Sequence, residues 1–293
     1  FDVDYSMGAG AFTAAPRLSR EKFDFAYGDI NSNIEVASKR PEKAGVGVYM
    51  MFSGSPSAIV LPANSKINSP TDLEGKKMTA HKTDVGKQTF EQFAQATGID
   101  ISTMTFSDEF GEWEVMFDQL DKGETDALFG YVSTTSQAVE SQGQKVEDRL
   151  KYLKYTEYVP YMYGSSLMAS QDMIKNRPED VKKMVTAIDK AVKAVVADPD
   201  AAIEVLMKKY PSWDATKKAA EKQRYVNTIN IEMGNKESVA KDGVGGIDVE
   251  RMQKSIDEAY TARKLPTKPE LKQVFDDSFL PPLEERIRVL EVK

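Results

Sequence analysis

Short apolar runs alternate with helical patterns along the first part of the chain. Each run is rich in β-branched or aromatic residues and has a length typical of a buried strand. Strands are predicted at residues 1–6, 23–28, 45–52, 57–62, 76–81, 101–106, 126–131, 150–155 and 165–170. Because helical patterns lie between most of these runs, the sequence predicts α/β units around a mostly parallel sheet.

Apolar residues at helical spacing predict helices within residues 87–97 and 112–123. From residue 178 onward the pattern is almost entirely helical, and an apolar stripe runs through residues 178–200. Asp198 and Pro199 suit the N-cap and first position of the next helix. No repeat or flexible linker separates the two halves, so interleaved domains are expected.

Composition limits the classes of protein that this chain can represent. Its 293 residues allow one large or two medium domains, and 41% hydrophobic with 29% charged residues is typical of a globular protein. The formal net charge of −7 argues against a nucleic-acid surface, which needs a basic field. No run reaches the roughly 20 apolar residues of a membrane span. No signal peptide is visible, and we expect a leader and some structured sequence to precede Phe1.

The chain contains no cysteine and a single histidine, His81. This composition excludes disulfides and a cysteine nucleophile and disfavours most zinc and non-haem iron sites, so we expect neither a metal nor a cofactor. Two enzyme alternatives stay open. A hydrolase could use His81 as a general base, although no G-x-S-x-G motif accompanies it. A dinucleotide-dependent enzyme could use the Gly8-x-Gly10 turn, which lacks the third glycine of that fingerprint.

The segment 69–90 predicts a strand that ends in a polar turn at the start of a helix. Backbone N–H groups and the helix dipole near Thr83 and Gly86 could bind an anion or a polar group. Thr83 or Asp84 could equally be an ordinary N-cap, and a cap residue can also face a cleft.

Aromatic residues gather at predicted strand ends and in the loops that follow. They are Tyr27, Phe52, Phe110, Trp113, Tyr131, Tyr158, Tyr161 and Tyr163. In an open α/β sheet ligands bind beyond the carboxyl ends of strands, so this distribution favours an aromatic-lined cleft. Phe52 and Trp113 are expected to be structural.

Four segments occur in an order that resembles a known family. They are KFDFAYGDINSN (22–33), SPTDLEGKKMTAH (69–81), KGETDALFGY (122–131) and EYVPYMYGSSLMASQDMIKNRPEDVKKMVTAI (157–188). Together they resemble the substrate-binding proteins of ABC importers, in particular the nitrate, taurine and thiamine-precursor type called SsuA/THI5-like or NMT1-like. The resemblance covers most of residues 1–197. Because the enzyme branch of that superfamily relies on a cysteine-rich stretch, the lack of cysteine argues against that branch.

The resemblance implies an α/β fold of the type II periplasmic-binding-protein class. Two α/β lobes would be joined by two crossover strands, with the helical C-terminal part packed on lobe I. Lobe I is expected to comprise residues 1–62 and 165–293, and lobe II the inserted residues 63–164. The family usually begins with a further strand and helix, so this chain is expected to start at what would be the second strand.

The implied function is that of an extracytoplasmic solute-binding protein, not an enzyme. It would capture a small heteroaromatic or anionic molecule between its lobes and present it to a membrane-bound ABC permease. Tyrosine and tryptophan would suit a heteroaromatic ligand, whereas a carboxylate or sulfonate would suit the helix start with Lys82 or Lys87 nearby. We expect a monomer that binds no nucleic acid, placed in the periplasm or anchored outside the membrane.

The resemblance also implies which positions face the ligand. Together with Gly10, these are Tyr27, Asp29, Asn31, His81, Thr83, Asp84, Gly86, Tyr131, Glu157, Tyr161 and Tyr163. Tyr131 stands where the family often has tryptophan followed by a proline motif that is absent here. No catalytic residue is expected.

Overall fold

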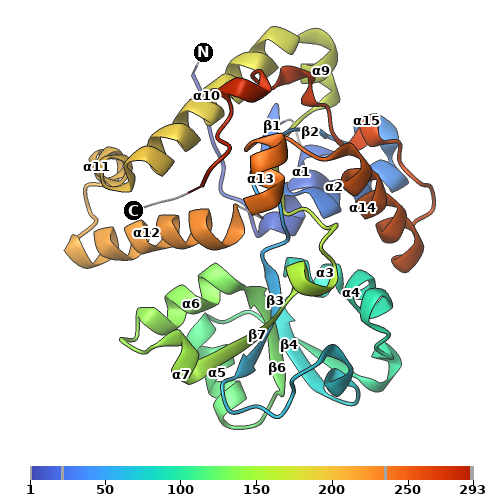
Figure 1. Ribbon diagram of the computed structural model, residues 1–293, viewed down its shortest axis with the longest axis vertical. Coiled ribbons are helices and arrows are strands. Elements are labelled where there is room, and N and C mark those ends of the chain that lie inside the picture. The colour runs from blue at the N-terminus through green and yellow to red at the C-terminus, as the bar shows by residue number, and fades with distance from the viewer. Residues whose placement is uncertain (1, 21–22, 234–235, 291–293) are drawn as a thin grey trace.

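The computed structural model describes residues 2–20, 23–233 and 236–290. Figure 1 shows two lobes, one above the other. The upper lobe, here lobe I, consists of the sheet β1-β8-β2 and the helices packed on it. The lower lobe, lobe II, consists of the sheet β5-β4-β6-β3-β7 and its own helices. The predicted α/β fold with two lobes is confirmed.

The strands of lobe I lie far apart in the sequence. They are β1 (Phe25–Asp29), β2 (Val46–Met50) and β8 (Ser165–Ala169). Strand β8 lies between the other two and is antiparallel to both, with Tyr27 opposite Leu167. The central strand of lobe I therefore comes from the segment that returns from lobe II.

Helices cover both faces of the sheet in lobe I (Figure 1). They are α1 (Ala14–Leu18), α2 (Ile30–Lys39), α9 (Gln171–Asn176), α10 (Pro178–Ala197), α11 (Pro199–Lys209), α12 (Ala215–Asn227), α13 (Lys236–Asp242), α14 (Val249–Ala262) and α15 (Leu271–Val274). One buried cluster joins α2, α14 and α15 through Ile34, Ile256 and Val274, and another joins α10 to β2 through Val185 and Val48. The helical C-terminal part thus packs on lobe I, as expected.

Lobe II has a mixed sheet with helices on both sides. Its strands are β3 (Ser57–Pro62), β4 (Lys77–His81), β5 (Thr105–Glu109), β6 (Ala127–Tyr131) and β7 (Leu150–Lys154). Its helices are α3 (Val85–Gln88), α4 (Phe90–Thr97), α5 (Trp113–Asp121), α6 (Val132–Glu140), α7 (Val146–Arg149) and α8 (Tyr155–Tyr158). Strand β4 is parallel to β5 and β6, but β3 is antiparallel to β6 and β7.

The prediction of a mostly parallel sheet is therefore wrong. Only pairs linked by helical connections, such as β4 and β5, are parallel, because parallel pairing needs a long crossover connection. Strands β3 and β8 follow the passages between the lobes, and they run against their neighbours.

Two strand predictions also differ from the structure. Residues 2–8 form exposed coil, because this segment pairs with no strand of the described chain; residue 1 lies outside the described residues. Residues 101–103 form a 3₁₀ turn instead of a strand, since the Asp100 carboxylate accepts the backbone N–H of Ser102 at 3.0 Å. Strand β5 begins only at Thr105. The helix predicted after Asp198 is confirmed, with the Asp198 side chain capping Ala201 at 3.0 Å.

Two crossover segments, residues 51–56 and 159–164, join the lobes. They lie side by side, since the N–H of Gly164 donates to the carbonyl of Phe52 at 3.0 Å and the N–H of Phe52 donates to Ser165 at 3.0 Å. A Cβ at Gly164 would lie 2.8 Å from the carbonyl oxygen of Gly54, so only glycine allows this approach.

The division into lobes stays a proposal, with one change of boundary. Residues 57–62 were expected in lobe I, yet β3 pairs with β6 and β7 of the five-stranded sheet. We therefore propose that lobe II begins after the first crossover segment, near Pro56, and ends before the second.

Candidate functional site

A cavity of about 520 Å³ lies where the two lobes meet. One wall comes from the turn before α1 in lobe I, and the other from loops at the carboxyl ends of β4, β5 and β6 in lobe II. Its lining residues are Ala9, Gly10, Ala11, His81, Lys82, Thr83, Asp84, Val85, Glu109, Phe110, Trp113, Tyr131 and Thr134. Five expected ligand positions, Gly10, His81, Thr83, Asp84 and Tyr131, thus share one cavity.

Strand β4 delivers the first group of side chains. His81 ends the strand, and its Nε2 donates to the carbonyl of Gly111 at 2.9 Å, while its ring meets the edge of Trp113 at 4.9 Å between centroids. Asp84 is the N-cap of α3, and its Oδ1 accepts the N–H of Lys87 at 3.0 Å. Burial raises the pKa of Asp84 to about 6.

The predicted helix start is a capped turn of four residues, since α3 ends at Gln88 and α4 begins at Phe90. Such a short helix has little dipole, so Asp84 rather than the helix end dominates the charge here. The ammonium group of Lys87 pairs with Asp108, and Lys82 is exposed.

Gly10 brings the two lobes together. Its φ of 100° is a conformation that favours glycine, and a Cβ there would lie 2.9 Å from Thr83 Oγ1. The Thr83 hydroxyl donates to the carbonyl of Ala9 at 3.1 Å, which is a direct hydrogen bond across the cavity mouth.

Asp29 and Asn31 are fully buried at the start of α2, beside the cavity rather than among its lining residues. Asp29 Oδ1 accepts both the N–H and the side-chain amide of Asn31 at 2.9 Å, and that amide also donates to Tyr163 at 2.8 Å. Burial raises the pKa of Asp29 to about 6. Within the described residues Asp29 Oδ2 and Asn31 Oδ1 have no hydrogen-bond partner.

Acidic groups from three distant segments surround the phenol of Tyr131. Burial raises its pKa well above the usual value, and the charges of Asp29, Asp84 and Glu232 raise it further. Glu232 ends the π-helical turn η5 (Thr228–Glu232) and accepts a hydrogen bond from Ser133 of lobe II. Tyr27 of β1 is 52% exposed.

The other expected positions do not line the cavity. Gly86 is buried, and its carbonyl accepts the Tyr155 hydroxyl at 2.7 Å. Glu157 is exposed on α8, and Tyr161 is buried under Lys254. Tyr163 is buried in the second crossover segment, with its ring 3.9 Å below the guanidinium of Arg251.

Sequence reasoning missed several residues of the site. Trp113 was expected to be structural but lines the cavity, and Glu109 and Thr134 line it too. The positions of Trp113 and Thr134 just after strand ends were a usable signal. Glu232, which acts on Tyr131 from outside the lining, had no such signal, because it lies in a π-helical turn after a helix and not at a strand end.

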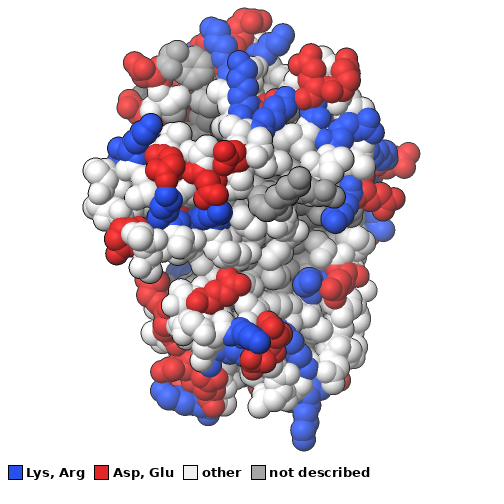
Figure 2. Space-filling model, turned by 60° about the vertical axis from the view of Figure 1, so that its left-hand side comes forward, with Lys and Arg blue, Asp and Glu red and all other residues white. Residues whose placement is uncertain are grey.

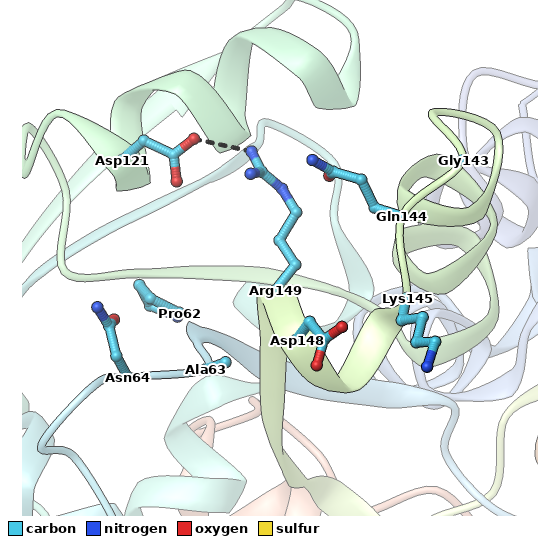
Figure 3. Close-up of a pocket in the computed structure, with 9 residues that line it drawn as sticks. All are labelled: Pro62, Ala63, Asn64, Asp121, Gly143, Gln144, Lys145, Asp148 and Arg149. Atoms are coloured by element: carbon cyan, nitrogen blue, oxygen red, sulfur yellow. Dashed lines mark hydrogen bonds and ion pairs between the residues drawn. The ribbon is translucent and has the colours of Figure 1, made fainter.

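A second cavity, of about 550 Å³, lies within lobe II and shares no lining residue with the first. Figure 3 shows it between the end of β3 and the loop before α7. Arg149 reaches across to Asp121 at 2.8 Å, and the basic groups Lys145 and Arg149 balance the acids Asp121 and Asp148. Because this cavity lies away from the meeting point of the lobes, we take the first cavity as the candidate site.

His81 and the Gly8-x-Gly10 turn do not have the surroundings that a hydrolase or a dinucleotide-binding site would need. The His81 ring already donates to a backbone carbonyl, and within residues 2–10 no strand precedes the Gly8-x-Gly10 turn.

No group of three or more metal-ligating side chains occurs in the described ranges. In the same ranges no helix is long and apolar enough to cross a bilayer. Lysines, arginines and acids are interspersed on the face in Figure 2.

Solved structures of the periplasmic-binding-protein fold resemble this protein. The aliphatic sulphonate binding protein SsuA of Escherichia coli matches with a TM-score of 0.63 and 15% identity, covering 94% of this chain and 82% of that one. The alkanesulfonate-binding SsuA of Xanthomonas axonopodis pv. citri, bound to MOPS, gives 0.63 and 13%, covering 92% and 86%. A Candida albicans protein with the generic periplasmic binding protein fold gives 0.59 and 16%, covering 91% and 83%.

The two lobes and the cavity between them thus define a protein of the periplasmic-binding-protein fold. Residues 1–202 match the family described as NMT1/THI5 like, and the chain belongs to that family. No curated protein matches the chain in sequence.

Proposed function

We propose that this protein is the extracytoplasmic solute-binding component of an ABC importer. One observation carries the proposal: the cavity of about 520 Å³ takes its walls from both lobes, with Gly10 on one side and Thr83 on the other. A volume of this size suits a small molecule, and walls on separate lobes allow the protein to close over it.

The proposed mechanism breaks no bond. Polar groups at strand ends, among them Asp84 and Tyr131, fix the ligand, and the aromatic face of Trp113 excludes water. Contacts made only when the lobes meet, such as that of Thr83 with Ala9, favour the closed form. A monomer then presents the closed form to a membrane permease, from the periplasm or from an anchor outside the membrane, without any role for nucleic acid.

A thermal-shift screen tests the proposal, because a ligand that binds only the folded form raises the melting temperature. The screen covers pyrimidines, aromatic acids, alkanesulfonates, nitrate and organic amines. We expect one class to raise the melting temperature of the wild type.

Thr83→Ala combined with Tyr27→Ala should weaken that binding at least tenfold. The matched control, Thr71→Ala with Tyr5→Ala, removes the same groups from exposed positions outside the cavity and should bind as the wild type does. If no compound binds and turnover of an ester or of a nicotinamide appears instead, the protein is an enzyme and the proposal is wrong.

A further inference from the structure

Three carboxyl groups from separate parts of the chain act on Tyr131, and one of them, that of Asp84, lines the cavity. Asp29 is the last residue of β1, Asp84 lies between β4 and α3, and Glu232 ends η5. Each acts on the Tyr131 phenol electrostatically, and Asp29 and Asp84 also act on one another across the lobe boundary. Packing of the two lobes therefore brings acidic groups together around Tyr131, which forms part of the cavity wall.

Buried acceptors at this point outnumber the donors. Asp29 is 0% exposed, and its Oδ2 has no partner within residues 2–20, 23–233 and 236–290. The side-chain oxygen of Asn31, which is equally buried, also has no hydrogen-bond partner in these ranges. The Tyr131 hydroxyl has no partner there either, and it can donate only one hydrogen bond. Buried polar groups in folded proteins are almost always paired, so the unpaired hydroxyl of Tyr131, a residue of the cavity wall, indicates that a ligand supplies its partner.

The charges of Arg263, Lys87 and Arg224 act on Asp29, Asp84 and Glu232 from a distance, without forming close ion pairs. No ion pair joins Asp29, Asp84 or Glu232 to a lysine or arginine of the described chain. The basic groups nearby have other partners: Arg263 pairs with Glu35, Arg224 with Glu221 and Lys87 with Asp108.

Burial raises the pKa of Glu232 to about 7, in the direction found for the two aspartates. His81 and the exposed Lys82 line the cavity from β4, and Glu109 faces it from β5. A cation seated among the carboxylates would supply the charge that burial leaves uncompensated.

Aromatic rings complete the environment. Trp113, Phe110 and Tyr131 line the cavity, and Tyr27 lies within the electrostatic range of Glu232. The faces of such rings attract cations, most strongly when water is excluded. Carboxylates together with aromatic faces form an environment that favours a positive group and disfavours a sulfonate or carboxylate.

We propose that the cleft selects an organic cation that carries N–H groups, such as a protonated amine, amidine or guanidinium, and rejects anionic ligands. In this arrangement Asp84 and the Tyr131 hydroxyl meet the N–H groups at the cavity wall, while Asp29 and Glu232, which do not line the cavity, act through their charge. The inference rests on the proposed function, because it names the class of ligand that the two lobes enclose. It differs from the heteroaromatic or anionic ligand expected from sequence.

A charge series on one carbon frame tests the inference. Titration calorimetry at pH 8 and low salt compares benzamidine with its neutral counterpart benzamide and with the anions benzoate and benzenesulfonate. Agmatine and phenethylamine extend the set of cations. We expect at least one cation to bind at least tenfold more tightly than every neutral or anionic compound, and its affinity to fall as sodium chloride is added.

Isosteric variants then test the carboxylates. Asp29→Asn, Asp84→Asn and Glu232→Gln keep an acceptor oxygen at each position but remove the charge, so the caps of α2 and α3 survive. Each should weaken binding of the cation at least tenfold. Asp121→Asn, which removes a carboxylate from the second cavity, is the matched control and should change nothing.

The results separate this inference from the proposed function. If a neutral or anionic compound of the wider thermal-shift screen binds and no cation does, the charge inference is wrong while the proposed function stands. The inference is also wrong if a cation binds and all three isosteric variants, checked as folded by circular dichroism, bind it as the wild type does. If nothing binds in either set, both proposals fall.

Discussion

Asp29 caps helix α2, but its negative charge is not needed for that structural role. Its Oδ1 caps α2 by accepting the N–H of Asn31, which any aspartate or asparagine at an N-cap does. Its Oδ2 is buried without a partner in the described chain, and burial raises the pKa of the carboxyl to about 6. An asparagine would cap the helix equally well, so the charge at this position destabilises the unliganded protein.

The dependence of stability on pH follows from the sign of that shift. Because the pKa of Asp29 is about 6 in the folded protein and 3.8 for an ordinary aspartate in an unfolded chain, the folded state holds the proton more tightly. The stabilisation is complete below pH 3.8 and is lost as the pH rises through 6. The Asp29→Asn variant has no carboxyl group to titrate at this position, so it does not lose this stabilisation as the pH rises. The difference in free energy of unfolding between the variant and the wild type should therefore shift in favour of the variant by on the order of 1–3 kcal/mol between pH 5 and 7.5.

Urea unfolding at both pH values measures this difference. The exposed Asp2→Asn variant controls for removal of a charge as such and should show no growth of the difference between the two pH values. A constant difference between Asp29→Asn and the wild type would contradict the assignment of the raised pKa to Asp29.

The candidate site was predictable from sequence where local chemistry determines it. His81 ends a strand and Asp84 caps the helix that follows it, and a polar residue there faces the end of the sheet in most arrangements. Trp113 was misjudged because a buried aromatic and a cavity-lining aromatic look alike in sequence. Glu232 was beyond reach, since its approach to Tyr131 depends on how α12 is placed over lobe II.

Helix α14 links the two crossover segments. The guanidinium of Arg251 donates to the carbonyl of Pro160 at 2.9 Å and to that of Met162 at 3.0 Å in one segment, and to Ser53 in the other. It also lies over the ring of Tyr163. A planar group with five N–H donors can satisfy these carbonyls together, whereas a lysine ammonium cannot span them.

Arg251→Lys should therefore loosen the passages between the lobes. We expect a loss of about 1–3 kcal/mol in free energy of unfolding and at least tenfold faster amide hydrogen exchange in residues 51–56 and 159–164. Exchange measured by mass spectrometry checks this. Arg177→Lys, at an exposed ion pair with Asp24 and Asp180, is the control and should leave exchange in both segments unchanged. Equal exchange in the two variants would show that Arg251 does not hold the segments.

At the scale of the molecule, the two-lobed arrangement could be expected only through the family resemblance. The pattern of strands and helices gave the correct class, α/β, but predicted parallel sheets, because strand direction is fixed by the way that β3 and β8 pass between the lobes. Local periodicity does not record which sheet a strand joins. The resemblance placed residues 57–62 in lobe I, whereas β3 pairs within the five-stranded sheet.

The lobes are held together by hydrogen bonds that span the boundary. Ser133 donates to Glu232, Gln137 donates to the carbonyl of Ala220 at 3.2 Å, and Gln95 donates to Glu258 at 3.0 Å. In Figure 1, α12 lies above α6, which places the first two of these contacts on one side of the cleft. The structure is therefore that of a closed arrangement.

Ser133→Ala removes one of these bonds from the closed form. Because a hydrogen bond to a carboxylate contributes about 1.5–3 kcal/mol, affinity for the ligand should fall about 10- to 100-fold, mainly through faster dissociation. Stopped-flow measurement of the dissociation rate tests this. Ser141→Ala, whose hydroxyl donates to the carbonyl of Ala138 at 2.8 Å within lobe II, is the matched control. Equal rates in both variants would mean that the bond does not favour closure.

Because Arg251 contacts both crossover segments, α14 is a suitable place for a label that reports movement of the lobes. Val249 is 58% exposed and stands two residues before Arg251. Since the sequence contains no cysteine, Val249→Cys would carry the only thiol in the chain, and a polarity-sensitive dye attached there would sit next to the joint between the lobes. Its fluorescence would follow opening and closing in real time, so that an unlabelled solute could be detected by light alone.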